Sequence, residues 1–225
     1  MYSKDRLLIL DADGTTIDAF SAIEQTFSAL NMKIGDLERF QKRRHIFKYL
    51  GGLKEFPTNL SRQLGKQKRS KLIQTLTEVY REEASLYPAT ETWMEQLFAT
   101  DRLRVGFVTR NITHKPLDTL KVLLMRHGVD TGRFDFLVHV ELNQDKTSAF
   151  RKLREAHSVN PARSYACGDE KKDYYAAQLT GMHPFMVSYG FEDFERLTYK
   201  IGVPGELISK TPEELHQRII HAFTD

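Results

Sequence analysis

The residues best suited to chemistry are aspartates that follow short apolar runs. Asp11 and Asp13 come directly after the apolar residues 7–10, and Asp169 follows a second such run with Asp173 four residues later. Carboxylates gathered at one site repel each other unless a cation holds them, and oxygen ligands suit Mg²⁺. A carboxylate beside Mg²⁺ can attack a phosphoryl group, and a second one two residues away can protonate the leaving oxygen. The aspartates therefore predict phosphoryl-transfer chemistry.

Hydroxyl and ammonium groups follow two more apolar runs. Thr109, Arg110 and Asn111 stand at the end of residues 103–109, and Lys146 follows residues 136–140. A hydroxyl and a lysine are suited to holding phosphoryl oxygens and the charge that develops on them. We therefore expect Thr109 and Lys146 to join the aspartates in one site.

The elements that must position these residues alternate between strand and helix. Apolar runs typical of buried strands occupy residues 7–10, 103–109, 136–140, 164–167 and 184–187, with a further short one at 206–208. Helical patterns separate them at 90–100, 116–127, 146–157 and 172–180, and a last helix follows Thr211. This alternation predicts an α/β fold with a doubly wound parallel sheet. Ligands bind at the carboxyl ends of such strands, so the fold should bring the polar residues together.

A helical insertion interrupts this pattern after the first strand. From residue 17 to residue 87 helix formers dominate without strand-like alternation, and helices are predicted at 18–31, 36–50, 57–65 and 67–86. We therefore expect a catalytic core of residues 1–16 and 88–225 and an inserted all-helical cap of residues 17–87.

The quoted residues resemble the four motifs of the haloacid dehalogenase (HAD) superfamily. Asp-Ala-Asp-Gly-Thr at 11–15, Thr109, Lys146, and Gly168-Asp169 with Asp173 occur in the order of those motifs. The inserted helices and residues 187–191 are similar to the phosphoglycolate-phosphatase-like branch of the superfamily. The resemblance implies a HAD-like Rossmannoid core and a phosphoric monoester hydrolase.

The resemblance also implies a role for each residue at the site. Asp11 would be the nucleophile, Asp13 the general acid and base, and Thr109 and Lys146 the groups that bind the phosphoryl group. A Mg²⁺ cofactor would be held by Asp11, the backbone carbonyl of Asp13 and Asp169, with Asp173 supporting it at or near the ion. Substrate binding would fall to Gly14, Thr15, Arg110, Asn111 and, from the cap, Lys54. Lys152 and Lys171 are weaker alternatives to Lys146 because they fall inside helical patterns.

Other chemistries of the superfamily fit less well. Haloalkanoic dehalogenases and phosphonoacetaldehyde hydrolases lack the second aspartate of the first motif, whereas Asp13 is present. Sugar phosphomutases resembling β-phosphoglucomutase place a His at the position that Ile23 occupies here. We therefore expect a Mg²⁺-dependent phosphatase that forms an aspartyl-phosphate on Asp11, with a phosphomutase-like phosphotransferase as the alternative.

The charge is unevenly distributed along the chain. The 225 residues include 33 Lys and Arg against 30 Asp and Glu, a net charge of +3, but ten basic residues and only Glu55 among the acidic ones lie between residues 40 and 72. Such a segment can be a solvated helical surface or an attraction for anions. The anion would be a small phosphorylated metabolite, or a polyanion such as nucleic acid. Nucleic acid is disfavoured because few aromatic residues interleave with the charges.

The remaining composition indicates a globular cytoplasmic protein. A single cysteine, Cys167, excludes an internal disulfide framework, and no apolar run approaches the roughly 18 residues of a membrane span. The specific substrate and the oligomeric state stay open at this point.

Overall fold

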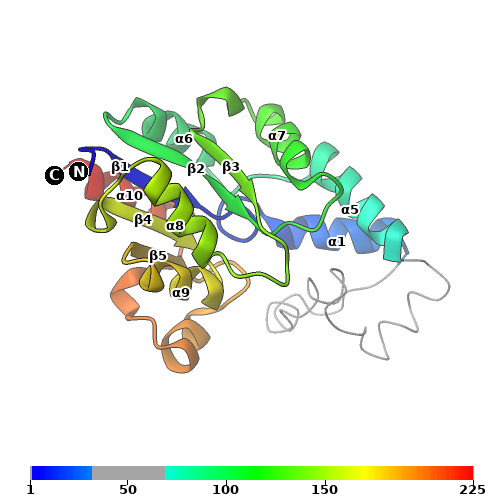
Figure 1. Cartoon of the computed structure of the whole chain (residues 1–225). Coiled ribbons are helices and arrows are strands. Elements are labelled where there is room, and N and C mark those ends of the chain that lie inside the picture. The colour runs from blue at the N-terminus through cyan, green and yellow to red at the C-terminus, as the bar shows by residue number, and fades with distance from the viewer. Residues whose placement is uncertain (1, 32–68, 225) are drawn as a thin grey trace.

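A six-stranded parallel sheet forms the centre of the protein (Figure 1). The computed structural model describes residues 2–31 and 69–224. The strands lie in the order β3-β2-β1-β4-β5-β6, and every pair of neighbours is parallel. Their bounds are β1 (Arg6–Leu10), β2 (Leu103–Thr109), β3 (Phe136–His139), β4 (Ser164–Gly168), β5 (His183–Val187) and β6 (Ile208–Ser209). The predicted α/β fold with a doubly wound parallel sheet is confirmed.

Helices cover both faces of the sheet (Figure 1). Their bounds are α1 (Ala19–Ala29), α5 (Arg69–Glu82), α6 (Thr90–Ala99), α7 (Pro116–Arg126), α8 (Thr147–Ala156), α9 (Lys171–Leu179) and α10 (Pro212–Thr224). Because side chains alternate along a strand, β1 contributes to two separate cores. Leu7 and Ile9 pack in the core that contains Phe150 of α8, whereas Leu8 and Leu10 pack in the core that contains α6, α7 and α10. Both faces of β1 are buried, which explains its continuous apolar sequence.

The order of the strands creates the site at which a ligand can bind. From β1 the sheet extends through β2 and β3 in one direction and through β4, β5 and β6 in the other. The winding therefore reverses between β1 and β4, and in doubly wound sheets the crevice at such a reversal is open at the carboxyl ends of the strands. The residues that follow β1, β2 and β4 meet there.

Among the predicted boundaries that differ from the structure, two have an identifiable structural cause. The helix predicted over 67–86 ends at Glu82, because the returning chain pairs with the departing one: Ile17 bridges Leu86, and the Tyr87 N–H donates to the Thr16 carbonyl at 2.9 Å. The strand predicted at 206–208 is β6, which begins only at Ile208 because Gly205–Leu207 form a 3₁₀ turn. The first difference reflects a contact between distant segments that a local pattern does not contain.

Helices α1 and α5 are the described parts of the predicted cap. They pack together, and α5 also packs against α7. Two hydrogen bonds fix α5 there: the His114 N–H donates to the Thr77 hydroxyl at 2.9 Å, and the Arg81 Nε–H donates to the Thr119 hydroxyl at 3.1 Å. The helices predicted at 36–50 and 57–65, Lys54 and nearly all of the basic segment lie outside the described residues. Within the described ranges no helix is both long and apolar enough to cross a membrane.

Candidate active site

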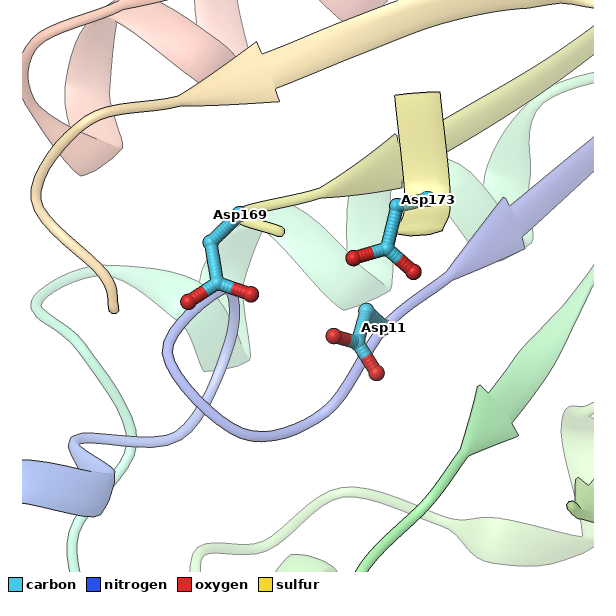
Figure 2. A group of neighbouring side chains, drawn as sticks. All are labelled: Asp11, Asp169 and Asp173. Carbon is cyan, nitrogen blue, oxygen red and sulfur yellow. The ribbon is translucent and has the colours of Figure 1, made fainter. Parts of the chain in front are cut away.

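Three buried aspartates meet at the carboxyl ends of the central strands (Figure 2). Asp11 follows β1, Asp169 follows β4, and Asp173 lies in the first turn of α9. Each offers a carboxylate oxygen, and these oxygens all lie within 4.8 Å of one another. The fold therefore brings together three of the four predicted metal-binding aspartates from positions far apart in the sequence.

Lys146 lies between two of these carboxylates. Its Nζ is 2.6 Å from Asp11 Oδ1 and 2.6 Å from Asp173 Oδ1, and its side chain is only 1% exposed. Lys152, by contrast, is exposed on α8, and the Lys171 ammonium lies over the Tyr175 ring. Of the three candidate lysines, only Lys146 contacts the aspartates within the described residues. It stands directly before α8.

One lysine does not offset the charge of three buried acids. Burial raises the pKa of the Asp11 carboxyl from 3.8 to about 7, although the charge of Lys146 acts in the opposite direction. Burial, and then repulsion by Asp11, raises the pKa of Asp169 well above its ordinary value. Negative charge at this point is therefore unstable without a further cation nearby.

The donor set fits Mg²⁺. The Asp169 carboxylate accepts the Phe191 N–H at 2.5 Å through Oδ2, while its Oδ1 is buried and has no hydrogen-bond partner among the described residues. A buried carboxylate oxygen without a partner is costly unless it binds an ion. The three clustered side chains offer only oxygen ligands, which Mg²⁺ prefers. Asp173 is more constrained, since its Oδ2 accepts the Glu170 N–H at 3.1 Å and its Oδ1 faces Lys146.

The side chain of Asp13 is held by other partners. Its Oδ1 accepts a hydrogen bond from the Tyr80 hydroxyl at 2.7 Å, and Asn111 Nδ2 lies 3.1 Å from Oδ1 and 3.0 Å from Oδ2. Asp13 is not a member of the group formed by the other three aspartates. The structure therefore separates the two carboxylates of the first motif, with Asp11 on the lysine and Asp13 on a tyrosine and an amide.

The residues at the end of β2 support the site in different ways. Thr109 is fully buried, and its hydroxyl accepts the Asn111 N–H at 3.1 Å. The Arg110 guanidinium forms an ion pair with Glu170, the residue after Asp169. Asn111, which is predicted to bind substrate, directs its amide at Asp13. The loops after β2 and β4 are thus joined beside the aspartates.

Two glycines leave the space that Asp169 occupies. A Cβ added at Gly14 or at Gly190 would collide with Asp169 Oδ2, and Gly14 also has a φ of +80°. Thr15, beside Gly14, is buried, and its carbonyl accepts the Tyr189 hydroxyl at 2.9 Å. Gly14 therefore lies against Asp169, and Thr15 contacts Tyr189, the residue before Gly190.

Replacing Gly190 with Ala is expected to weaken metal binding and to lower stability. The added methyl group would collide with both Asp169 and the Gly14 carbonyl, and overpacking of this kind costs about 1–3 kcal/mol. Isothermal titration with Mg²⁺ and urea unfolding would measure the two effects. Gly205→Ala is the matched control, because its Cβ would meet only Phe194 at an ordinary 3.6 Å. Equal Mg²⁺ affinity in the two variants would contradict the expectation that Asp169 binds the ion.

Among the residues that contact the site, Tyr80, Glu170 and Gly190 were not predicted. Tyr80 lies in the predicted cap helix, Glu170 stands directly after Asp169 within the fourth motif, and Gly190 lies in the segment 187–191 that carried only a general resemblance. The fixed spacing of the motifs gives no signal for Tyr80 or Glu170, because each acts on a residue more than one element away. Gly190 had a weak signal, a glycine after a predicted strand.

The comparisons with known proteins agree with this geometry. The sequence profile of the haloacid dehalogenase-like hydrolases matches residues 8–187. A phosphoglycolate phosphatase from Vibrio parahaemolyticus is 25% identical over 207 residues, which cover 86% of this chain and 88% of the relative. The profile spans β2 to β5 and most of β1, and it includes every aspartate of the site.

Solved structures share the fold. A hydrolase from Pseudomonas syringae superposes with a TM-score of 0.64 at 18% identity, over 96% of this chain and 99% of that one. A candidate β-phosphoglucomutase from Thermotoga maritima superposes with a TM-score of 0.65 at 18% identity, over the same shares of the two chains. From the sheet, the buried aspartates with their lysine, and the match over most of its length, we conclude that this chain belongs to the haloacid dehalogenase-like hydrolase family.

Proposed function

We propose that this protein is a Mg²⁺-dependent phosphatase that hydrolyses a small phosphomonoester through an aspartyl-phosphate on Asp11. The observation that carries the proposal is the group of three buried carboxylates with the Lys146 ammonium among them. The curated relatives named phosphoglycolate phosphatase support the same class of reaction.

Each step can be assigned to a residue of this chain. Lys146 and the Ala12 N–H both bind Asp11 Oδ1, so we assign Oδ2 as the atom that attacks phosphorus. The phosphorus–oxygen ester bond breaks as Asp13 gives a proton to the leaving oxygen. Water then attacks the same phosphorus while Asp13 takes its proton, which releases phosphate and restores Asp11. Lys146 and Thr109 would hold the phosphoryl oxygens.

The metal would lie against Asp11 and Asp169, with the Asp13 carbonyl as a third ligand and Asp173 beside it. When bound, Mg²⁺ would neutralise the repulsion among the carboxylates and charge on the phosphoryl oxygens. The partnerless Asp169 Oδ1 supports this placement.

The substrate would be a small phosphorylated metabolite. We propose that Gly14, Thr15 and Arg110 border its phosphoryl end and that Lys54 reaches it from the cap, within a division into core (1–16, 88–225) and cap (17–87). Ile23 is fully buried on α1, in the place where phosphomutases carry a His. This position offers no acid or base, which favours hydrolysis over phosphoryl transfer between sugar hydroxyls.

A panel of phosphorylated metabolites tests the proposal. We expect release of inorganic phosphate from at least one small phosphomonoester with Mg²⁺ present, and its loss with excess EDTA. Asp169→Asn is expected to raise the Mg²⁺ concentration required for half-maximal activity by about 10–100-fold, as the loss of a metal ligand or its support does. Turnover that persists undiminished in EDTA would exclude the metal-dependent mechanism, and inactivity on the whole panel would exclude the proposed substrate class.

A further inference from the structure

We propose that Tyr80 is a positioning residue for proton transfer: its hydroxyl holds Oδ1 of Asp13, so that Oδ2 is the oxygen that gives and takes the proton. This inference rests on the proposed function, in which Asp13 is the general acid and base. It assigns a role in the chemistry to a residue of the helical insertion.

The side chain of Asn111 has a defined orientation. Its Oδ1 accepts the Thr113 N–H at 2.8 Å and the Thr113 hydroxyl at 2.5 Å. The backbone N–H can only donate, so the amide oxygen must face Thr113 and the Nδ2 group must face Asp13. The Asn111 amide group therefore approaches Asp13 as a donor, 3.1 Å from Oδ1 and 3.0 Å from Oδ2.

Tyr80 makes the two oxygens of Asp13 unequal. Asn111 lies almost equally far from both oxygens of Asp13 and does not distinguish them. The Tyr80 hydroxyl donates to Oδ1 alone, at 2.7 Å. The last torsion of an aspartate is broad and nearly two-fold, so without Tyr80 the two oxygens can exchange places. With Tyr80, Oδ1 accepts from two donors and Oδ2 from Asn111 alone, so Oδ2 is the oxygen with room to exchange the proton.

Tyr80 is itself held in place by packing. Its side chain is 1% exposed and belongs to the large core shared by α1, α5, α6 and α7. The neighbouring turn of α5 is attached to α7 through the hydrogen bond from Arg81 to Thr119, and Thr77 accepts the His114 N–H. The hydroxyl position is therefore set by the packing of α5 and not by Asp13, which is the requirement for a positioning residue.

The experiment compares two leaving groups. Tyr80→Phe keeps the buried ring and removes the hydroxyl, and kcat/KM is measured with glycerol phosphate or the best alkyl substrate and with p-nitrophenyl phosphate. An alkoxide leaves only with a proton from Asp13, whereas nitrophenolate leaves without one. We expect kcat/KM to fall about 10–100-fold for the alkyl ester and less than about 3-fold for the nitrophenyl ester, since acid catalysis contributes roughly 10²–10⁴-fold.

A control variant and a double-mutant cycle distinguish a positioning role of Tyr80 from a purely structural one. Tyr87→Phe is the matched control, because the Tyr87 hydroxyl is buried yet makes no hydrogen bond within the described residues. It should leave both kcat/KM values unchanged. In an Asp13→Asn background, Tyr80→Phe should lower the residual activity on the alkyl ester by less than about 2-fold, because the group it positions is gone.

The outcomes distinguish this inference from the proposed function. Three results would each overturn the role of Tyr80. They are an equal loss on both esters in Tyr80→Phe, an unchanged alkyl-ester rate, and an alkyl-ester loss in the Asp13→Asn background as large as in the wild type. If Tyr80→Phe unfolds, the cycle is completed with 3-fluorotyrosine at position 80, which must change the alkyl-ester rate and spare the nitrophenyl ester. A wild-type protein without activity on any phosphomonoester would refute the proposed function itself.

Discussion

Asp11→Asn is expected to reduce phosphatase turnover by at least about 10⁴-fold, because an amide does not form the acyl phosphate through which the proposed reaction runs. The shape of the side chain is conserved, and Lys146 keeps its second partner, Asp173, at 2.6 Å. The variant should therefore stay folded while it loses activity. Phosphate release and thermal unfolding, measured on the same preparation, check the two statements together.

Asp101→Asn is the matched control for this change. Its side chain is 96% exposed, on the turn before β2, and its loss should alter neither rate nor stability. Trapping ³²P on the wild-type protein by acid quench, and its absence in Asp11→Asn, would test the intermediate directly. Full activity in Asp11→Asn would refute a phosphoryl-enzyme at this position.

Lys146→Met is expected to remove activity and to destabilise the fold by about 3–5 kcal/mol, the cost of leaving buried charge without its partner. Two carboxylates, Asp11 and Asp173, lose the ammonium that lies 2.6 Å from each. Methionine approximates the volume of lysine, so the loss reports on charge more than on packing. Urea unfolding at neutral pH measures the free energy of unfolding.

Lys152→Met, on the helix that follows Lys146, provides the comparison. Lys152 is exposed on α8, so its replacement should change the free energy of unfolding by less than about 0.5 kcal/mol and leave turnover unaltered. Equal effects of the two substitutions would show that Lys146 is not the residue that balances the aspartates.

The strands and the order of the layers could be predicted because burial on two faces leaves a continuous apolar run. Residues 103–109 were predicted as a strand and form β2 with the same bounds. The helix bounds were less accurate where tertiary contacts end a helix early, as the pairing of Leu86 with Ile17 does after α5. The cap as a separate domain stays a prediction, since residues 32–68 lie outside the described part.

The clustering of Asp11, Asp169 and Asp173 could also be predicted. Each stands directly after a buried strand or in the first turn of the helix beyond it, and parallel strands end at one edge of the sheet. Lys146 was the less secure assignment, because a lysine at the start of a helix is common on surfaces. Its two ion pairs at 2.6 Å distinguish it from Lys152 and Lys171.

The sequence by itself determined the sheet, the order of the site residues and the acidic chemistry, because these follow from local pattern and from strand ends. Only the tertiary structure decided what contacts Asp13. Tyr80 lies 67 positions and Asn111 98 positions from it along the chain. Such a contact depends on the packing of α5 against α1 and α7, and neither hydrophobic period nor motif spacing specifies where a tyrosine on that helix will point.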